Sequence, residues 1–195
     1  MFLIAMALAA QQASIEDVKV DLQASPQATA SVADGVEIVR LVIAPDGRAA
    51  GCSARILGVG PVEDRANCKK LAKMTATPAI DHRGSRVYGA VEFRLIWVTD
   101  RLTGSRASPP AGAADLYLPL QRIPDGLRRR VVELRLVVAS DGKVENCETV
   151  TGSGRAALDK AACDAAVSGG VAPLKDASGT PVRGVQNLSI GFVKQ

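Results

Sequence analysis

The sequence predicts an α+β fold built from two tandem small domains, each an antiparallel sheet in the order β-β-α-β with one helix on a face. Three observations lead to this class. The stretch "APDGRAAGC" at 44–52 returns as "ASDGKVENC" at 139–147. An apolar residue at every second position precedes each Asp-Gly pair, which is typical of a strand that enters a hairpin. A segment with helical periodicity follows each copy.

The repeat defines the domain organisation. When residues 38–98 are placed over residues 133–193 at a constant offset of 95, 16 of 61 positions are identical and no gap is needed. The identities fall on turn residues, strand residues and cysteines, which are positions that fix a backbone, so both copies should have one fold. We therefore expect repeat 1 over 35–98, a linker over 99–127 and repeat 2 over 128–195.

Each repeat should begin with a β-hairpin. Residues 132–138 alternate with one steadily apolar face, and residues 39–43 carry the same pattern. The strands end at Asp46-Gly47 and Asp141-Gly142, where glycine adopts a positive φ without steric cost. A second, shorter strand follows each turn and carries the first cysteine of the repeat.

A helix and a final strand complete each repeat. Residues 156–167 are rich in alanine, with apolar residues at helical spacing, and predict a helix of about three turns. The corresponding segment of repeat 1 is 62–73. An Asp-x-x-Gly turn comes next, and the last strands alternate over 91–97 and 186–193.

The four cysteines predict one disulfide in each repeat. Cys52, Cys68, Cys147 and Cys163 could pair in three ways. The repeat selects Cys52–Cys68 and Cys147–Cys163, which would each join a hairpin to its helix. No C-x-x-C is present and His82 is the only histidine, so we expect no metal site.

The first residues predict an exported protein. Residues 1–13 resemble a short secretory signal, in which Ala7-Leu8-Ala9 fits an A-x-A cleavage site. About nine apolar residues are too few to cross a bilayer, where ~20 are needed, so we expect no transmembrane anchor. The even number of cysteines also favours export, because disulfides form in oxidising compartments such as the periplasm. The alternative is that these residues are the first segment of a cytosolic protein, either disordered or forming a strand.

An ordered series of motifs in repeat 2 resembles the C-terminal domain of the TonB energy-transducer family. The motifs are the strand 132–138, Asp141-Gly142, "TGSG" at 151–154, Leu158-Asp159, Ala161-Ala162, Pro173, Gly179, Pro181-Val182 and the strand 186–193. Repeat 1 keeps the turn residues, but its loop and helix start differ. The resemblance covers about two-thirds of the chain and implies tandem TonB C-terminal-like domains. The membrane anchor and long Pro-rich spacer of the family have no counterpart here, and "YLPLQRIP" at 117–124 stands where the family often carries Tyr-Pro.

The sequence disfavours an enzyme and a cofactor. Nucleophilic catalysis needs a base beside the nucleophile, and His82 lies in a predicted turn. Aspartates that recur in both repeats lie in glycine-containing turns, where their side chains accept backbone hydrogen bonds. The "GSG" at 152–154 lacks the Lys-Ser/Thr of a phosphate loop. The net charge of +4 is mild and "RRR" at 128–130 is the only basic run, so we expect no nucleic-acid partner.

What remains is non-catalytic protein recognition. An open sheet edge accepts an extended peptide as an added strand, and the resemblance implies this mode for a cell-envelope partner, namely a segment of an outer-membrane receptor in TonB-dependent transport. We expect binding at repeat 2, because no segment follows its last strand to cover it. The alternative is a structural or dimerisation module without a transport role, in which the two repeats pack on each other or two chains form a homodimer. The predicted partner-binding edge consists of Gln186, Asn187, Leu188, Ser189, Ile190, Gly191 and Phe192.

Overall fold

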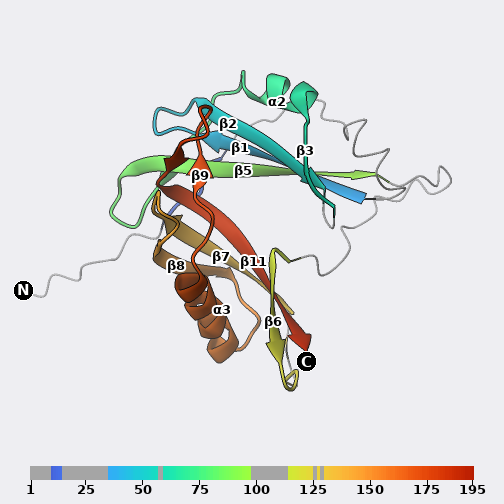
Figure 1. Cartoon of the computed structure of the whole chain (residues 1–195). Helices are drawn as coiled ribbons and strands as arrows, with labels where there is room; N and C mark the ends of the chain where they lie inside the picture. Colours follow the sequence, from blue (N-terminus) through green and yellow to red (C-terminus); the bar gives the residue numbers. More distant parts are fainter. Residues whose placement is uncertain (1–9, 15–34, 57–58, 98–113, 125–126, 128–129) are drawn as a thin grey trace, which may run out of the picture.

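The computed structural model describes residues 10–14, 35–56, 59–97, 114–124, 127 and 130–195, and it confirms the α+β class with mostly strands and two helices (Figure 1). The strands of the first part of the chain are β1 (Gly35–Ile43), β2 (Ala49–Ile56), β3 (Gly60–Val62), β4 (Ala79–Ile80) and β5 (Arg86–Trp97). The later strands are β6 (Leu116–Leu120), β7 (Val131–Val138), β8 (Val144–Thr151), β9 (Leu174–Lys175), β10 (Pro181–Val182) and β11 (Gly184–Lys194). The helices are α2 (Arg65–Leu71) and α3 (Ala156–Gly169).

One mixed sheet runs through both parts of the chain. Its order is β3-β2-β1-β5-β11-β7-β8, with β4 paired to β5 and β6 paired to β11, while β9 and β10 form a separate small ladder. The two predicted antiparallel sheets are therefore joined: β5 and β11 pair in parallel, Tyr88 opposite Gly184 and Gly89 opposite Val185. This pairing could not be predicted from the sequence pattern, because the joining ladder is only two residues long on each strand.

Some corresponding elements of the two halves begin and end 95 positions apart. This holds for β2 and β8, for β4 and β9, and for one bulge in the first strand of each half, between Val42 and Ile43 and between Val137 and Val138. The hairpin glycines have φ of +85° at Gly47 and +89° at Gly142. The positive φ expected of glycine at these turns is therefore observed.

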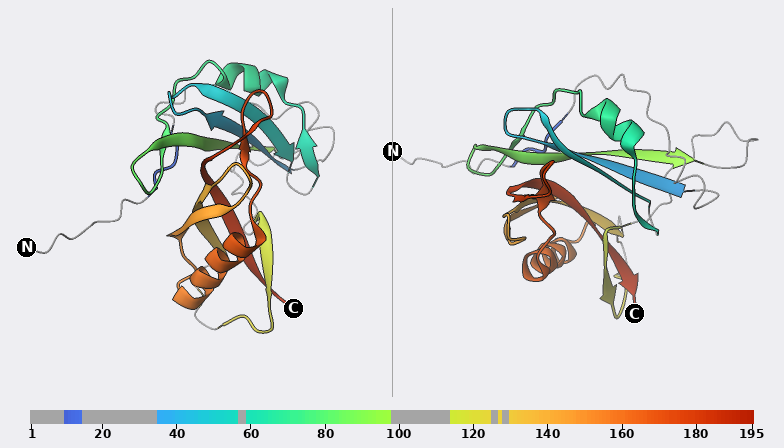
Figure 2. Two further views of the ribbon diagram at one scale, coloured as in Figure 1. Left: turned by 60° about the vertical axis from the view of Figure 1, so that its left-hand side comes forward. Right: turned by 45° about the horizontal axis from the view of Figure 1, so that its top comes forward.

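The two helices lie on opposite faces of the sheet, as the two views in Figure 2 show. The register of the β5–β11 ladder explains this arrangement. Gly89 lies opposite Val185 and not opposite Gly184, which is 95 positions further along the chain. A shift of one residue moves every side chain to the other face of a sheet. The apolar face of the second half therefore points away from that of the first, and each helix covers its own half.

Two main hydrophobic clusters result. The first contains Leu71 of α2, residues of β1 and β5, and also Val137 and Val185 from the second half. The second lies under α3 and contains the inward side chains of β7 and β11. Because Val137 and Val185 are fully buried in the first cluster, the first half completes its core with residues of the second.

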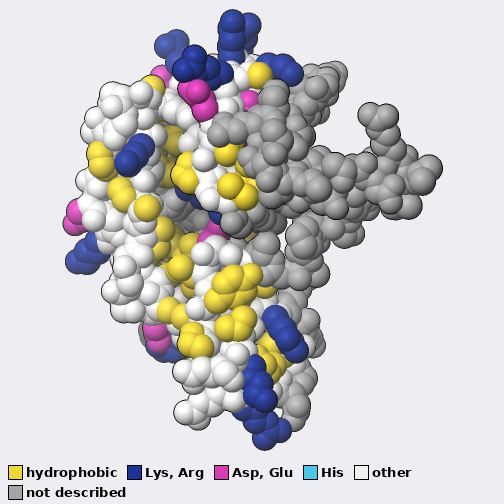
Figure 3. Space-filling model, turned by 45° about the vertical axis from the view of Figure 1, so that its right-hand side comes forward, with side chains coloured by type: hydrophobic (Ala, Val, Ile, Leu, Met, Phe, Trp, Pro, Cys, Tyr) yellow, Lys and Arg dark blue, Asp and Glu magenta, His cyan; other side chains and the backbone are white. Residues whose placement is uncertain are grey.

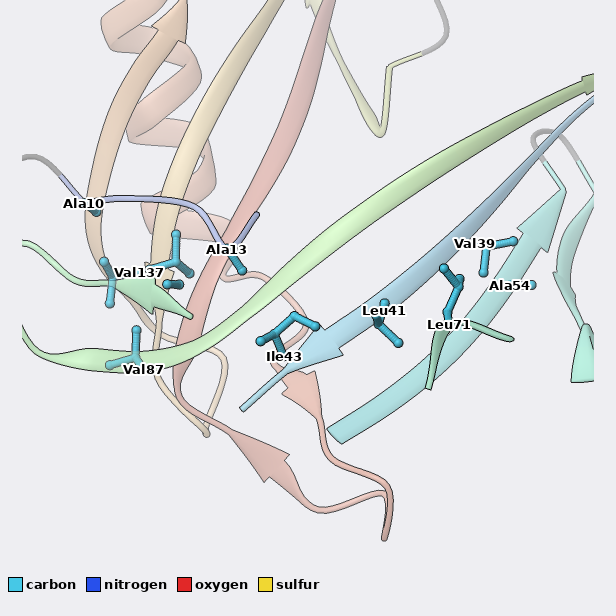
Figure 4. Packing of buried hydrophobic residues seen from close by; sticks show 11 residues of the cluster. Ala10, Ala13, Val39, Leu41, Ile43, Ala54, Leu71, Val87 and Val137 are labelled. Carbon is cyan, nitrogen blue, oxygen red and sulfur yellow. The ribbon is translucent and has the colours of Figure 1, made fainter. Parts of the chain in front are cut away.

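The N-terminal segment 10–14 belongs to the first cluster. Ala10 and Ala13 are 1% and 4% exposed, and Figure 4 shows them beside labelled residues of both halves. Gln11 forms an antiparallel bridge with Ile80, and Ser14 forms one with Thr77. Residues 10–13 of the predicted leader over 1–13 thus pack in the first cluster, and residues 1–9, with the A-x-A motif, lie outside the described residues. Small residues such as Ala10 and Ala13 suit both the end of a leader and a buried segment, so the sequence does not distinguish the two.

Both disulfides have the predicted pairing. Cys52 bonds Cys68 with a Cα–Cα distance of 5.6 Å, and Cys147 bonds Cys163 at 5.8 Å. Each bond joins the second strand of a hairpin to the helix of the same half. Neither helix of the described chain is both long and apolar enough to cross a membrane.

We predict that replacing Cys147 and Cys163 together with alanine lowers the free energy of unfolding by about 3 kcal/mol, because the disulfide restricts the unfolded chain. Urea denaturation followed by fluorescence or circular dichroism measures the change. Peptide mapping without reductant should recover Cys52 with Cys68 and Cys147 with Cys163. Peptides that join one half to the other would contradict this pairing.

We predict that Gly184→Ala destabilises the protein by about 1–3 kcal/mol. A Cβ at Gly184 would lie 2.6 Å from the Tyr88 carbonyl oxygen and 2.8 Å from Leu174 Cδ1, so the β5–β11 ladder would have to separate. Gly169→Ala is the matched control, since a Cβ there meets nothing within 4 Å. Equal urea midpoints for the two variants would show that close packing at Gly184 does not hold the halves together.

Candidate strand-binding site

The predicted partner-binding residues 186–192 lie inside the sheet and not at its edge. Strand β7 pairs with one side of β11 over Gly184–Gly191. On the other side, β5 pairs with 184–185 and β6 pairs with 190–194. The expectation of an open edge along the whole strand is therefore corrected. The strand that covers part of this edge, β6, lies in the segment predicted to be a flexible linker. Pro119 and the lack of polar alternation in that segment did not indicate a strand.

The side chains of this strand divide between the two faces. Leu188, Ile190 and Phe192 lie in the second cluster, as the alternation predicted. Asn187 is exposed, whereas Gln186 is only 2% exposed and its Nε2 donates to the Ala172 carbonyl at 2.9 Å. The side chain of Gln186, one of the predicted partner-binding residues, is therefore buried and already has a backbone partner.

The backbone of β11 has one open position between β5 and β6. The Ser189 N–H donates to Asp115 Oδ2 at 2.9 Å, and the Ser189 carbonyl accepts from the Asp115 N–H at 2.9 Å. The Phe192 N–H points to the opposite side and donates to the Arg130 carbonyl. Successive residues of a strand direct their backbone groups to opposite sides, so the N–H and carbonyl of Asn187 point toward β5 and β6. No strand of the described chain pairs with Asn187 on that side.

Two cavities lie along this open position, and we call them together the β5–β11 opening. Their volumes are about 420 and 330 Å³. Both are lined by Arg40, Asp115, Gln186, Asn187 and Leu188, so they meet at the open backbone position. Volumes in this range are typical of binding sites for small groups of residues or small molecules.

Strand β5 has the other unpaired edge beside the opening. Beyond Gly89, no described strand pairs with β5 on the side away from β1. The Ala90 carbonyl accepts a hydrogen bond from Gln12 Nε2 of the N-terminal segment. Arg40 and Glu92, which form an ion pair at 2.6 Å, lie opposite each other on β1 and β5 and line the opening.

Asp115 closes one end of the opening, and we call its contacts the Asp115 clasp. Its Oδ1 accepts from Arg55 at 2.6 Å, and its Oδ2 accepts from the Ser189 N–H and hydroxyl at 2.9 and 2.7 Å. Burial would raise the pKa of Asp115, but the Ser189 donors and the Arg55 charge outweigh it and hold the pKa below its ordinary value. The clasp thus joins β2 of the first half to β6 and β11.

Arg183 joins the halves at the other end of the β5–β11 ladder. Its guanidinium lies 2.9 Å from Asp81 in the turn before β5 and 2.8 Å from Glu145 in β8. Burial would raise the pKa of Asp81, but the Ser85 and Arg83 N–H groups and Arg183 outweigh it and lower the pKa. The hydrogen bond from Arg183 lowers the pKa of Glu145. These carboxylates therefore contribute stability only while they are ionised.

The described residues offer no metal site, since no group of three or more His, Cys, Asp or Glu side chains among them could hold an ion. The recurring turn aspartates accept hydrogen bonds from backbone N–H groups two residues further on, as at Asp46 and Asp141. Figure 3 shows Lys and Arg side chains in several separate groups on the face that it draws.

Comparison with known proteins identifies one domain. Residues 130–193 match the family model described as the Gram-negative bacterial TonB protein C-terminal, and this stretch contains β7, β8, α3 and β9 to β11. The match does not extend to residues 35–98. Neither a curated protein nor a solved structure matches the chain.

We predict that Arg183→Met lowers the free energy of unfolding at pH 7 by about 1–3 kcal/mol, because two ionised carboxylates lose a charged donor. Both carboxyl pKa values lie below their ordinary values of 3.8 and 4.5, so the native contribution is present above those values and is lost as the pH falls through the lowered ones. The difference between variant and parent should therefore disappear in strong acid. Urea titrations at several pH values test this, and a difference independent of pH would contradict it.

Proposed function

We propose that this protein is a non-catalytic, TonB-like periplasmic protein that binds an extended segment of a cell-envelope protein by strand addition, in connection with TonB-dependent outer-membrane transport. The observation that carries the proposal is the match of residues 130–193 to the TonB C-terminal family. The open backbone position at Asn187, with a cavity on each side, supplies the kind of surface that strand addition needs. The proposed partner is a segment of an outer-membrane receptor.

The proposal includes a second, diverged TonB C-terminal-like copy over residues 35–98, with 99–127 as the linker and 128–195 as the matched copy. Support comes from the geometry that the halves share. Their hairpin turns, bulges and disulfides recur 95 positions apart, and so do the glycines Gly84 and Gly179, with φ of +80° and +81°. Loss of the loop and helix-start motifs in the first copy accounts for a family match confined to the second.

A periplasmic location is supported by the two disulfides, because bonds of this kind form and persist in oxidising compartments. Export by a leader over residues 1–9 is part of the proposal. Cleavage after Ala9 would leave the structural segment 10–14 in the mature chain.

The second candidate function is a structural or dimerisation module. Strand β8 favours it, because among the described residues β8 pairs only with β7 and leaves its outer edge open. Two copies could join there into a larger sheet. Glu145 and Glu148 lie along this edge, and like charges that meet across such a contact would oppose it.

A photo-crosslinking amino acid at position 187 tests binding at the opening in living cells. We expect a product with one envelope protein, and mass spectrometry should place the crosslink in an extended segment of that partner. The same amino acid at Val167, which is 51% exposed on α3, is the matched control and should give no such product. Products containing only two copies of this chain would favour the dimerisation module instead.

Asn187→Pro should weaken partner binding at least tenfold, because proline removes the N–H that points into the opening while the β7 ladder keeps its donors. Asn187→Ala removes only the side chain and should change the affinity by less than about threefold. Affinity measured by biolayer interferometry with the crosslinked partner distinguishes the two. Equal effects of both substitutions would exclude backbone pairing at this residue.

A further inference from the structure

Strand β6 occupies the edge of β11 in a way that differs from the other pairings of the main sheet. It pairs with the main sheet through β11 alone, in parallel, over the five pairs Leu116–Ile190 to Leu120–Lys194. Leu116 and Tyr117 are 47% and 50% exposed. Pro119 lies in the middle of the strand and has no N–H to donate. Figure 3, which brings the side of β6 forward, shows hydrophobic side chains gathered on this face.

The contacts of β6 define what the edge of β11 accepts. Asp115, directly before β6, supplies a carboxylate to Ser189 and Arg55. Leu118 and Leu120 pack against the second hydrophobic cluster. The ring of Tyr117 lies over Gly191, where a Cβ would be 2.7 Å from the ring carbons. A strand that fits this edge therefore carries a carboxylate, an aromatic ring that lies over Gly191 and two apolar side chains at alternate positions.

The open position at Asn187 adjoins this occupied edge. A segment that runs parallel to β11 can form its first backbone hydrogen bonds at Asn187 and then continue along Ser189 to Val193 only where β6 has left. The equivalent edge of the first half, on β5, has no such strand among the described residues. Of these two edges, only the edge of β11 is covered by a strand of the described chain, namely β6.

We propose that β6 is a resident strand that a partner displaces: an extended segment with an acidic residue followed by alternating apolar side chains pairs at Asn187 and then replaces β6 along β11. This inference rests on the proposed function and names the partner chemistry at the same site. Because β6 is tethered to the edge it covers, its effective concentration is in the range of ~mM, so it competes with any free segment. The Asp115 clasp sets how strongly it competes.

A peptide with the sequence of residues 114–121, ADLYLPLQ, is the probe, and the full chain is the protein. Asp115→Ala in the chain should bind this peptide at least fivefold more tightly than the parent, because the resident strand is weakened while the peptide keeps its own carboxylate. A variant that merely damaged the fold would bind the peptide less tightly. Asp141→Ala is the matched control, since it removes a carboxylate that accepts only from its own turn, and it should leave the affinity unchanged.

Two further measurements decide the proposal independently of that variant. Pro119→Cys with Val193→Cys places two cysteines opposite each other on β6 and β11, and the resulting bond should abolish peptide binding. In the parent, hydrogen exchange of the Ser189 amide, which faces β6, should be at least tenfold faster than that of the Phe192 amide, which faces β7. Unchanged binding by the locked protein, or equal exchange of the two amides, overturns the displacement.

The outcomes separate this inference from the proposed function. If the lock abolishes peptide binding but no envelope protein crosslinks at position 187, β6 is displaceable and the proposed function fails. If the locked protein still crosslinks an envelope partner at 187, the proposed function stands and displacement is wrong.

Discussion

The short parallel ladder between β5 and β11 is the constraint on which the rest of the structure depends. It joins only Tyr88 and Gly89 to Gly184 and Val185, yet it converts two small sheets into one. The close approach requires Gly184, whose Cβ position is filled by the Tyr88 carbonyl. Its one-residue offset reverses the faces of the halves and thereby places α2 and α3 on opposite sides. Beyond the ladder the strands separate, and that separation creates the opening beside Asn187.

Each end of the opening is fixed by different chemistry. At the ladder end, backbone hydrogen bonds and the ion pairs of Arg183 hold the halves together. At the far end, the Asp115 clasp joins three strands through one carboxylate. A carboxylate that satisfies several donors is held firmly, but it can be replaced by another carboxylate with the same geometry. Under the proposed displacement of β6, the far end is the one that exchanges, and a ligand with an acidic residue would bind there.

Local patterns predicted most of the elements and both disulfides. Alternation located the first strands and β11, Asp-Gly located the hairpin turns, and the 95-residue repeat selected the cysteine pairs from three alternatives. The joining of the halves could not be predicted, because a ladder of two residues leaves no periodicity. Strand β6 was missed because Pro119 interrupts a nearly all-apolar run within the predicted linker. The packing of residues 10–14 was missed because small residues also suit a leader. Of the candidate site, the sequence identified the correct strand but not the neighbours that cover most of its edge.

The participation of the N-terminal segment in the first hydrophobic cluster has a consequence for the order of folding. The Ala10 carbonyl accepts from Arg135, and Ala10 shares its cluster with Val137 and Val185, which are made long after it. The first half of the chain therefore lacks part of its core until the second half has been synthesised, and this part comes from residues distant in sequence. Chains with such non-local contacts fold slowly. The same packing that unites the halves should therefore delay folding of the first half until the whole polypeptide has emerged.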